Sequence, residues 1–290
     1  MRIVMTGATG FIGTRLASVL REAGHEIVKL GRGATADYRW DPASDAPSEA
    51  FEGAEAVVHL AGEPVAQKWT PESKQRIRDS RVSGTERLIH GLSVTRNRPK
   101  VLVCASAVGY YGDRGDTALP ESARPGKGFL PEVCVDWEAK ADLAAALGMR
   151  VVKVRTGVVL GPNGGALKEM LTPFKLGVAG RLGSGKQWMP WIHLEDIVGI
   201  FRHAVEGRPA GPLNGVSPGI VTNAEFTTEL GKALHRPTIL PVPGFALKLL
   251  FGEMAEVLLG GQRVIPQATE QSGYRFQYPE LRAALASLKL

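Results

Sequence analysis

The chain begins MRIVMTGATGFIG (residues 1–13), in which a short apolar run ends at Thr6 and glycines follow at positions 7, 10 and 13. Residues 11–23 then show the period of an amphipathic helix, because apolar side chains recur every three or four positions along one face. A second apolar run, residues 26–30, begins soon after Gly24. This opening stretch therefore predicts a strand, a glycine turn, a helix and a second strand.

The alternation of apolar runs and helical periods continues to residue 154. Further strands are expected at residues 54–61, 100–105 and 150–154, with helices at residues 72–92 and 133–147. These strands are apolar throughout instead of alternating with polar residues, which is typical of strands that are buried on both faces. We therefore expect an α/β fold with a doubly wound parallel sheet that is covered by helices on both sides.

The sequence becomes rich in glycine beyond residue 156. Residues 157–185 hold eight of the chain's 35 glycines, which predicts loops that close over a ligand site, with a linker as the alternative. Helices are expected at residues 191–207, 223–234, 245–259 and 279–288, and a last strand of the main sheet at residues 212–216.

The composition is that of an ordinary globular protein, with 44% hydrophobic and 22% charged residues among 290. Two cysteines, Cys104 and Cys134, are too few for the disulfide framework of a small secreted domain, so a cytoplasmic location is expected. No apolar run approaches the ~20 residues that span a bilayer. Because the chain runs straight into a strand and a glycine turn, we expect no cleavable signal before the fold. No Cys/His cluster has metal-ligand spacing, so no metal site is predicted.

The net charge of +6 can be accounted for by residues 67–100, which hold nine basic and three acidic residues. We interpret this stretch as a solvated helix face, with a surface for polyanions or a basic wall near a phosphate ligand as the alternatives. It lacks the pattern of aromatic and basic residues that is typical of nucleic-acid binding. The expected partner is instead a small-molecule substrate, bound by a monomer or a homodimer.

The opening glycine turn has the properties of a dinucleotide-binding turn. Gly7 permits the tight turn, Gly10 lets the backbone approach a pyrophosphate, and Gly13 allows the helix to pack closely on the sheet. The helix that follows would present free N–H groups and the positive end of its dipole to the phosphates.

The end of the second strand indicates which dinucleotide is bound. An acidic residue there would bind the free ribose 2′-hydroxyl of NAD. The sequence instead reads Leu30-Gly31-Arg32, and a guanidinium is suited to a 2′-phosphate. The pattern therefore favours NADP(H) over NAD(H), although Arg32 could also be an exposed turn residue.

Several further motifs resemble those of a known superfamily. They are His59–Gly62 (HLAG), Ala107–Asp113 (AVGYYGD), Arg155–Pro162 (RTGVVLGP), Pro173–Gly177 (PFKLG), Gly183–Gln187 (GSGKQ), Trp191–Asp196 (WIHLED), Gly260–Pro266 (GGQRVIP) and Gly273–Phe276. Together with the TGATGFIG turn, they resemble the extended short-chain dehydrogenases/reductases of the nucleoside-diphosphate-sugar epimerase/dehydratase type. Within that group, the resemblance is to the "epimerase family" proteins with a C-terminal tail of the DUF1731 type, and it covers essentially the whole chain.

The resemblance implies a Rossmann domain that binds NADP(H) and a smaller C-terminal substrate domain. The Rossmann domain would comprise residues 1–165, with residues 190–220 returning to it, and the substrate domain residues 166–189 and 221–290. The cofactor contacts that the resemblance implies come from Gly7, Thr9, Gly10, Phe11, Ile12, Gly31, Arg32, Leu60, Ala61, Gly62, Arg81 and Val158.

The chain departs from the superfamily where catalysis is concerned. Members of the superfamily use a Ser or Thr together with a Tyr and a Lys four residues after it, the Tyr acting as acid/base. Here the Tyr position holds Cys134 and the Lys position Glu138, while Lys140 is two residues out of phase and would point about 200° away on the helix. The usual mechanism therefore cannot be transferred to this chain.

Other residues are candidates for proton transfer. Ser106 could take the serine role, although a register shifted by one residue would place Ala107 there instead. Glu63, Tyr110 and Tyr111 follow strand ends, where parallel sheets place their ligands. Cys134 is a weaker candidate, because Glu138 nearby would raise the pKa of its thiol. It is also possible that no residue transfers a proton.

Two further groups of residues allow a structural and a functional interpretation. His193 and Asp196 are interpreted as structural residues at a helix start. Trp188 and Trp191 could either form the wall of a substrate pocket or pack in the core.

Two functions follow from these observations. The first is an NADP(H)-dependent oxidoreductase or epimerase-like enzyme acting on a small hydroxyl- or carbonyl-bearing molecule. The second is an NADP(H)-binding sensor that has lost turnover. The missing Tyr and Lys favour the sensor, whereas the retained pocket loops and the superfamily favour the enzyme.

Overall fold

The computed structural model describes residues 1–290 and is built on one sheet of seven parallel strands. The strands lie in the order β11-β7-β5-β4-β1-β2-β3. Their bounds are β1 (Arg2–Thr6), β2 (Glu26–Gly31), β3 (Tyr38–Arg39), β4 (Ala56–His59), β5 (Val101–Ala107), β7 (Arg150–Thr156) and β11 (Gly211–Gly215). The chain runs outward from β1 in both directions, so the strand order reverses between β1 and β4. In such sheets ligands bind outside the carboxyl ends of the strands at this switch point.

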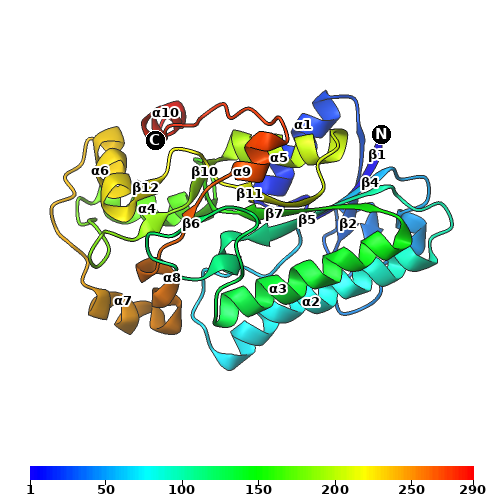
Figure 1. Ribbon diagram of the computed structural model, residues 1–290, viewed down its shortest axis with the longest axis horizontal. Helices are drawn as coiled ribbons and strands as arrows, with labels where there is room; N and C mark the ends of the chain where they lie inside the picture. Colours follow the sequence, from blue (N-terminus) through cyan, green and yellow to red (C-terminus); the bar gives the residue numbers. More distant parts are fainter.

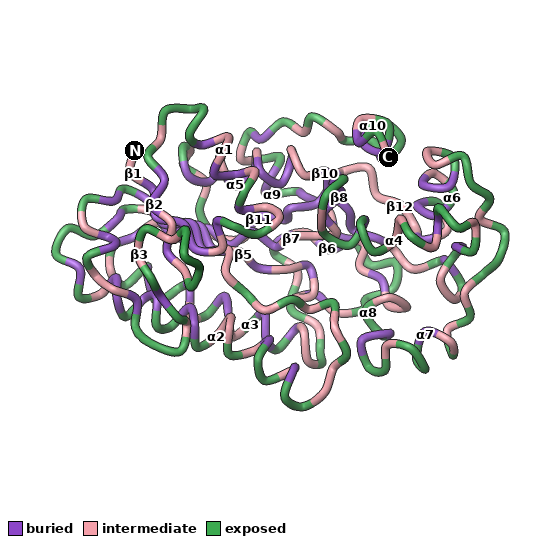
Figure 2. The backbone as a smooth tube through the Cα atoms, turned by 180° about the vertical axis from the view of Figure 1, so that it is seen from behind, coloured by how far each residue is buried: buried purple, intermediate pink, exposed green.

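Helices cover both faces of the sheet, as the sequence predicts (Figure 1). α1 (Phe11–Glu22) and α5 (Leu194–Glu206) pack on one face, and their core cluster holds 22 buried residues. α2 (Pro71–Val94) and α3 (Phe129–Asp142) lie side by side on the other face over a second cluster of 19. Figure 2 shows the buried residues concentrated along these strands.

The rest of the chain forms small sheets and short helices at one end of the molecule. The paired strands are β8 (Val158–Leu160) with β10 (Trp191–His193), β9 (Trp188–Met189) with β12 (Val221–Thr222), and β6 (Ala118–Leu119) with β13 (Arg263–Val264). The helices are α4 (Gly165–Lys175), α6 (Asn223–Leu234), α7 (Gly244–Phe251), α8 (Ala255–Leu259), α9 (Gln267–Gln271) and α10 (Leu281–Ser287). A third core cluster of 12 residues holds most of this region together. The two-domain division that the sequence predicts stays a prediction.

The strands predicted up to residue 154, and the last strand near residue 212, are confirmed, but four other expectations need correction. The helix predicted over residues 245–259 is divided into α7 and α8 by a turn at Gly252–Met254. Residues 157–185 are not only loops, because they contain β8 and α4. Their glycines serve packing: a Cβ at Gly164 would lie 2.5 Å from the Phe11 ring. Residues 191–193 form a strand, so the predicted helix begins at Leu194, and α3 begins at Phe129 instead of residue 133. The two-residue edge strand β3 was not predicted.

No helix of the structure combines the length and the apolarity that crossing a membrane requires.

We predict that Gly13→Ala destabilises the chain. A Cβ at Gly13 would overlap the carbonyl oxygen of Gly7, and neither backbone can yield without moving α1 from the sheet. Overpacking of this kind costs about 1–3 kcal/mol, measurable by urea unfolding. Gly33→Ala is the matched control, because a Cβ there meets nothing within 4 Å. Equal free energies of unfolding for the two variants would contradict the close contact between Gly13 and the Gly7 carbonyl.

Candidate functional site

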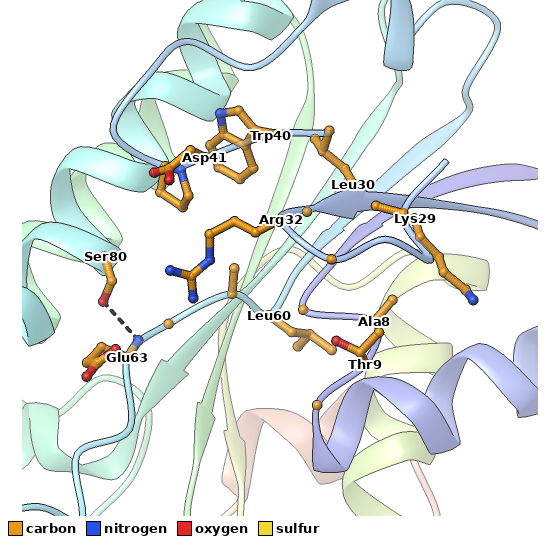
Figure 3. Close-up of a pocket in the computed structure, with 18 of the residues that line it drawn as sticks. Ala8, Thr9, Lys29, Leu30, Arg32, Trp40, Asp41, Leu60, Glu63 and Ser80 are labelled. Carbon is orange, nitrogen blue, oxygen red and sulfur yellow. Dashed lines mark hydrogen bonds between the residues drawn. The ribbon is translucent and has the colours of Figure 1, made fainter. Parts of the chain in front are cut away.

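A cavity of about 800 Å³ opens at the switch point, beside the carboxyl ends of β1, β2 and β4 (Figure 3). Four segments that follow strands line it: Gly7–Gly10, Lys29–Gly33 with Thr35 and Ala36, Trp40–Ala43 and Leu60–Glu63. The remaining wall comes from α2, through Arg76, Asp79, Ser80 and Ser83. A cavity of this size is in the range of small-molecule and cofactor sites.

Glycine is required where β1 ends, because the backbones of two strand ends nearly touch. Gly7 has a φ of +66°, in the left-handed region that favours glycine. A Cβ at this position would lie 2.7 Å from the carbonyl carbon of Leu60. Any larger residue would push β1 and β4 apart and open the floor of the cavity.

A buried hydrogen-bond network holds the same two strand ends together. The Thr6 hydroxyl oxygen lies 2.7 Å from Nδ1 of His59 and accepts hydrogen bonds from the backbone N–H groups of Leu60 and Ala61. Nε2 of His59 lies 3.1 Å from the hydroxyl of Thr85. Burial lowers the pKa of His59 to about 4, so the ring is neutral at neutral pH.

The first turn of α1 is open to an anion. No side chain caps this helix at Gly10, and its first turn carries no acidic residue. By contrast, Thr70 and Ser73 form a capping box at the start of α2. Free N–H groups and an uncompensated helix dipole beside a cavity are the features of a phosphate site.

Cations surround the other side of the cavity. Arg32 extends into it from the end of β2 in Figure 3, and Lys29 and Arg76 also line it. Sequence reasoning did not assign the wall that Arg76, Ser80 and Ser83 form. The sequence signal for this wall was the i, i+4, i+7 spacing of the three residues, which places them on one face of a predicted helix. The alternative interpretation of residues 67–100, a basic wall near a phosphate ligand, agrees with this position. No spacing or motif in the sequence indicated that Trp40–Ala43 would line the cavity.

The structure brings eight of the twelve predicted cofactor residues to the cavity: Gly7, Thr9, Gly10, Gly31, Arg32, Leu60, Ala61 and Gly62. Phe11 and Ile12 instead belong to the packing around α1, where Phe11 fills the space left by Gly161, Gly164 and Gly165. Arg81 donates hydrogen bonds to the carbonyl oxygens of Glu63 and Ile77, behind the cavity wall. Val158 lies in β8. Contacts from these four residues stay predictions.

The side chain at the position of the superfamily's Lys is a buried carboxylate. Glu138 is 6% exposed and pairs with the guanidinium of Arg155, with Nε–Oε1 and Nη2–Oε2 distances of 2.8 Å. The Ser106 hydroxyl donates to the same carboxylate at 2.7 Å. Lys140 pairs with Glu86 instead, on the α2 side. The position that should carry a cation therefore carries an anion, and Arg155 supplies the cation from β7.

Two of the proton-transfer candidates are protonated and buried. Burial, with the Glu138 carboxylate nearby, raises the pKa of the Cys134 thiol to about 12. The Tyr111 hydroxyl donates to Asn214 at 2.7 Å and accepts from Arg155 at 2.9 Å. Burial raises the pKa of Tyr111 to about 12 despite these partners. Both groups therefore stabilise the interior and are poorly placed to exchange protons with a substrate.

Tyr110 and Glu63 differ from these buried groups. The Tyr110 ring lies 3.5 Å from the guanidinium carbon of Arg155, and its hydroxyl takes no part in the network around Tyr111. Glu63 lines the cavity, where Arg76 lies 3.6 Å from its carboxylate and Gln67 donates to it at 3.2 Å. The structure thus separates the four candidates: Glu63 lies at the cavity, and Ser106, Tyr110 and Tyr111 surround Arg155.

The residues of the WIHLED motif have structural roles. His193 caps α5 by accepting a hydrogen bond from the backbone N–H of Glu195 at 3.1 Å. Asp196 accepts hydrogen bonds from the backbone N–H groups of Gln277 and Tyr278, which ties the C-terminal tail to α5. Trp191 is 1% exposed and belongs to the core. No three His, Cys, Asp or Glu side chains gather as a metal site would require.

Trp188 is only partly buried and lies beside the tail. Its indole N–H donates to Asp116 at 2.8 Å, and the guanidinium carbon of Arg263 lies 5.0 Å from its ring.

We predict that Glu138→Ala lowers the free energy of unfolding by about 3–5 kcal/mol, because it leaves the Arg155 charge buried without its partner. Glu132→Ala is the control on the same helix, since Glu132 is exposed in the first turn. Urea unfolding of both variants measures the difference. If Glu138→Ala loses no more free energy of unfolding than the control, the Glu138–Arg155 pair is not a buried ion pair.

Comparison with known proteins identifies the family. Residues 3–215 match the model of the NAD dependent epimerase/dehydratase family, and residues 242–288 match a domain of unknown function, DUF1731. The chain is 41% identical over 301 residues to the chloroplastic SDR39U1 homolog of Arabidopsis thaliana, an epimerase family protein, covering 99% of this chain and 86% of the relative. It is 39% identical to epimerase family protein SDR39U1 of Homo sapiens, covering 99% of both chains.

Two solved structures agree with this assignment. Human epimerase family protein SDR39U1 (isoform2), crystallised with NADPH, superposes with a TM-score of 0.91 at 38% identity, over 100% of this chain and 99% of that one. A nucleoside-diphosphate sugar epimerase from Corynebacterium glutamicum gives a TM-score of 0.82 at 34% identity, over 99% of this chain and 57% of that one. The seven-stranded parallel sheet, the glycine turn and these matches lead to one conclusion: the chain belongs to the NAD-dependent epimerase/dehydratase family, which its motifs resemble.

Proposed function

We propose that this chain is an NADP(H)-dependent oxidoreductase or epimerase-like enzyme that acts on a small hydroxyl- or carbonyl-bearing substrate. The observation that carries the proposal is the cavity at the switch point, which joins an uncapped helix start at Gly10 to a guanidinium at Arg32. The human relative crystallised with NADPH supports the same cofactor.

The residues present fit a dinucleotide phosphate. The glycine turn forms a backbone cradle that a Cβ at Gly7 would fill, and α1 offers its first-turn N–H groups to the pyrophosphate. No carboxylate of this chain pairs with Arg32 in an ion pair, so its guanidinium is available for a 2′-phosphate. Arg76, across the cavity, is partly neutralised by Glu63.

Proton transfer is assigned to Tyr110. NADPH supplies a hydride to the substrate carbon when it is bound. Tyr110 donates the proton to the substrate oxygen, and Arg155 fixes the position of its ring by stacking against it. Glu138 in turn holds Arg155 through two hydrogen bonds. In this proposal Ser106, Tyr111 and Cys134 keep the surrounding interior in place.

One observation favours a second function, an NADP(H) sensor without turnover. The positions of the superfamily's Tyr and Lys hold a protonated thiol and a carboxylate that is engaged with Arg155. The cofactor cavity does not depend on either position. A chain that has lost catalysis could therefore still bind the cofactor.

Arg32→Ala is expected to weaken NADPH binding about 10- to 100-fold and to leave NADH binding unchanged, since a charge-assisted hydrogen bond contributes about 1.5–3 kcal/mol. Fluorescence titration with both cofactors measures the effect. Arg21→Ala, an exposed arginine in the last turn of α1, is the control. Unchanged NADPH affinity in Arg32→Ala would contradict the proposal that Arg32 binds the 2′-phosphate.

Turnover is measured by incubating the protein and NADPH with a panel of aldehydes, ketones, quinones and nucleotide sugars. We expect Tyr110→Phe to lower kcat about 10²- to 10⁴-fold without changing NADPH affinity, because it removes a general acid. Cys134→Ala is expected to retain activity, since its thiol is buried and protonated. Tight NADPH binding with no substrate consumed would instead support the sensor.

A further inference from the structure

Most of the large hydrophobic side chains that are exposed lie outside the cofactor cavity. Twelve large hydrophobic side chains of the chain are exposed, and eight of them belong to residues 176–178 and 239–257. We call this set the α7 face: Leu176, Val178, Ile239, Leu240, Phe245, Leu249, Leu250 and Val257. The other four are scattered along the chain: Met1, Val94, Val135 and Leu143.

The two segments of the α7 face are neighbours in space. The backbone N–H of Val242 donates to the carbonyl oxygen of Arg181 at 2.9 Å, and Gly183 donates back to Val242 at 2.9 Å. Arg236 donates to the carbonyl oxygen of Lys175 at 3.0 Å. Figures 1 and 2 place α7 at one end of the molecule, opposite the end where β2 and β3 lie.

The α7 face is built from strongly exposed side chains. Leu249 is 88% exposed, Ile239 83% and Phe245 75%. On α7 itself only Leu247 is buried, so this short helix rests on the protein through one side and presents the rest to its surroundings. Exposed apolar patches that polar residues surround mark sites of interaction with proteins or membranes.

The charge around this face is mainly positive. Residues 175–186 and 235–257, which hold the whole face, contain five basic residues and two acidic ones: Lys175, Arg181, Lys186, Arg236 and Lys248, with Glu253 and Glu256. All five basic residues are exposed, and none forms an ion pair with a carboxylate. The basic helix α2 is different, since Lys74, Arg76, Arg78 and Arg87 each pair with an acidic side chain. Five unpaired cations therefore surround the α7 face, against one unpaired carboxylate, Glu256, because Glu253 pairs with Lys74.

We propose that the α7 face docks this protein on an anionic lipid surface. Leu, Ile and Phe side chains on a short helix enter the boundary between headgroups and acyl chains, while Lys and Arg at the rim contact anionic headgroups. The attachment is peripheral, and it is compatible with the cytoplasmic location that the sequence predicts, because the cytoplasmic leaflet is anionic.

A second copy of the chain fits this face less well. In a two-fold symmetric dimer the same patch meets itself, which would bring five unpaired cations and a single unpaired carboxylate, Glu256, toward the same set. A bilayer accepts projecting aliphatic side chains without a matching groove. The excess of positive charge and the projecting side chains therefore favour the lipid surface.

Sedimentation with vesicles tests the proposal on the full chain. We expect binding to phosphatidylcholine vesicles that contain phosphatidylglycerol, and at least tenfold weaker binding to phosphatidylcholine alone. Raising NaCl from about 0.1 M to about 1 M shortens the Debye length from ~10 Å to ~3 Å and should release much of the bound protein. Absence of binding to the anionic vesicles would overturn the proposal.

Variants show which face binds. Phe245→Ser/Leu249→Ser should weaken vesicle binding at least about tenfold, because it removes two large apolar side chains from the lipid. Both residues are exposed, so NADPH titration should be unchanged and serves as the folding control. Val94→Ser, at a 63% exposed position elsewhere, should bind vesicles like the unmodified chain.

Three results would contradict this assignment. Equal vesicle binding by the double variant and the unmodified chain would exclude the α7 face. A dimer in analytical ultracentrifugation that the double variant abolishes would assign the face to a second copy. Binding of polyglutamate without binding of anionic vesicles would assign it to an acidic protein.

Discussion

The close contact between the ends of β1 and β4 is the constraint on which the site depends. Gly7, in the left-handed region, lets the chain turn directly against Leu60, and the Thr6–His59 hydrogen bond holds the two strand ends together. α1 consequently begins at the edge of the sheet with an uncapped first turn. Because the strand order reverses between these same two strands, the cavity opens where the helix start can reach it.

A second constraint lies further along the same edge, between α3 and β7. Burying Glu138 alone would be costly, and burying Arg155 alone would be equally so. Their two hydrogen bonds, together with those of Ser106 and Tyr111, satisfy both charges. The superfamily's Lys is therefore replaced by a complete ion pair that contributes to the interior. This arrangement removes one proton-transfer system and leaves Tyr110 stacked on a fixed guanidinium.

Local sequence signals were enough to predict the sheet and much of the cofactor cavity. The TGATGFIG turn and the apolar runs are contiguous in sequence, so their periodicity and spacing could be interpreted without the fold. The residues of the glycine-rich region were harder to interpret, because Gly164 and Gly165 make room for Phe11, which lies more than 150 residues earlier. The strand at Trp191–His193 was hidden because its apolar residues continue into the pattern of α5.

Long-range pairing was beyond the sequence. Nothing near Glu138 indicates that Arg155 lies against it, and nothing near Trp40 indicates that it lines the cavity. Each depends on which strands become neighbours. The positive charge of the α7 face could not be recognised from the sequence either, because residues 67–100 alone account for the net charge of the whole chain. Only the structure distinguishes the two basic regions, since it shows that cations of α2 form ion pairs.

The most direct test of this account is a crystal structure of the chain with NADPH. We predict the pyrophosphate at the first turn of α1 and the 2′-phosphate within hydrogen-bond distance of the Arg32 guanidinium, with the Glu138–Arg155 pair intact. A pyrophosphate bound away from the Gly7–Gly10 turn, or a 2′-phosphate directed away from Arg32, would contradict it.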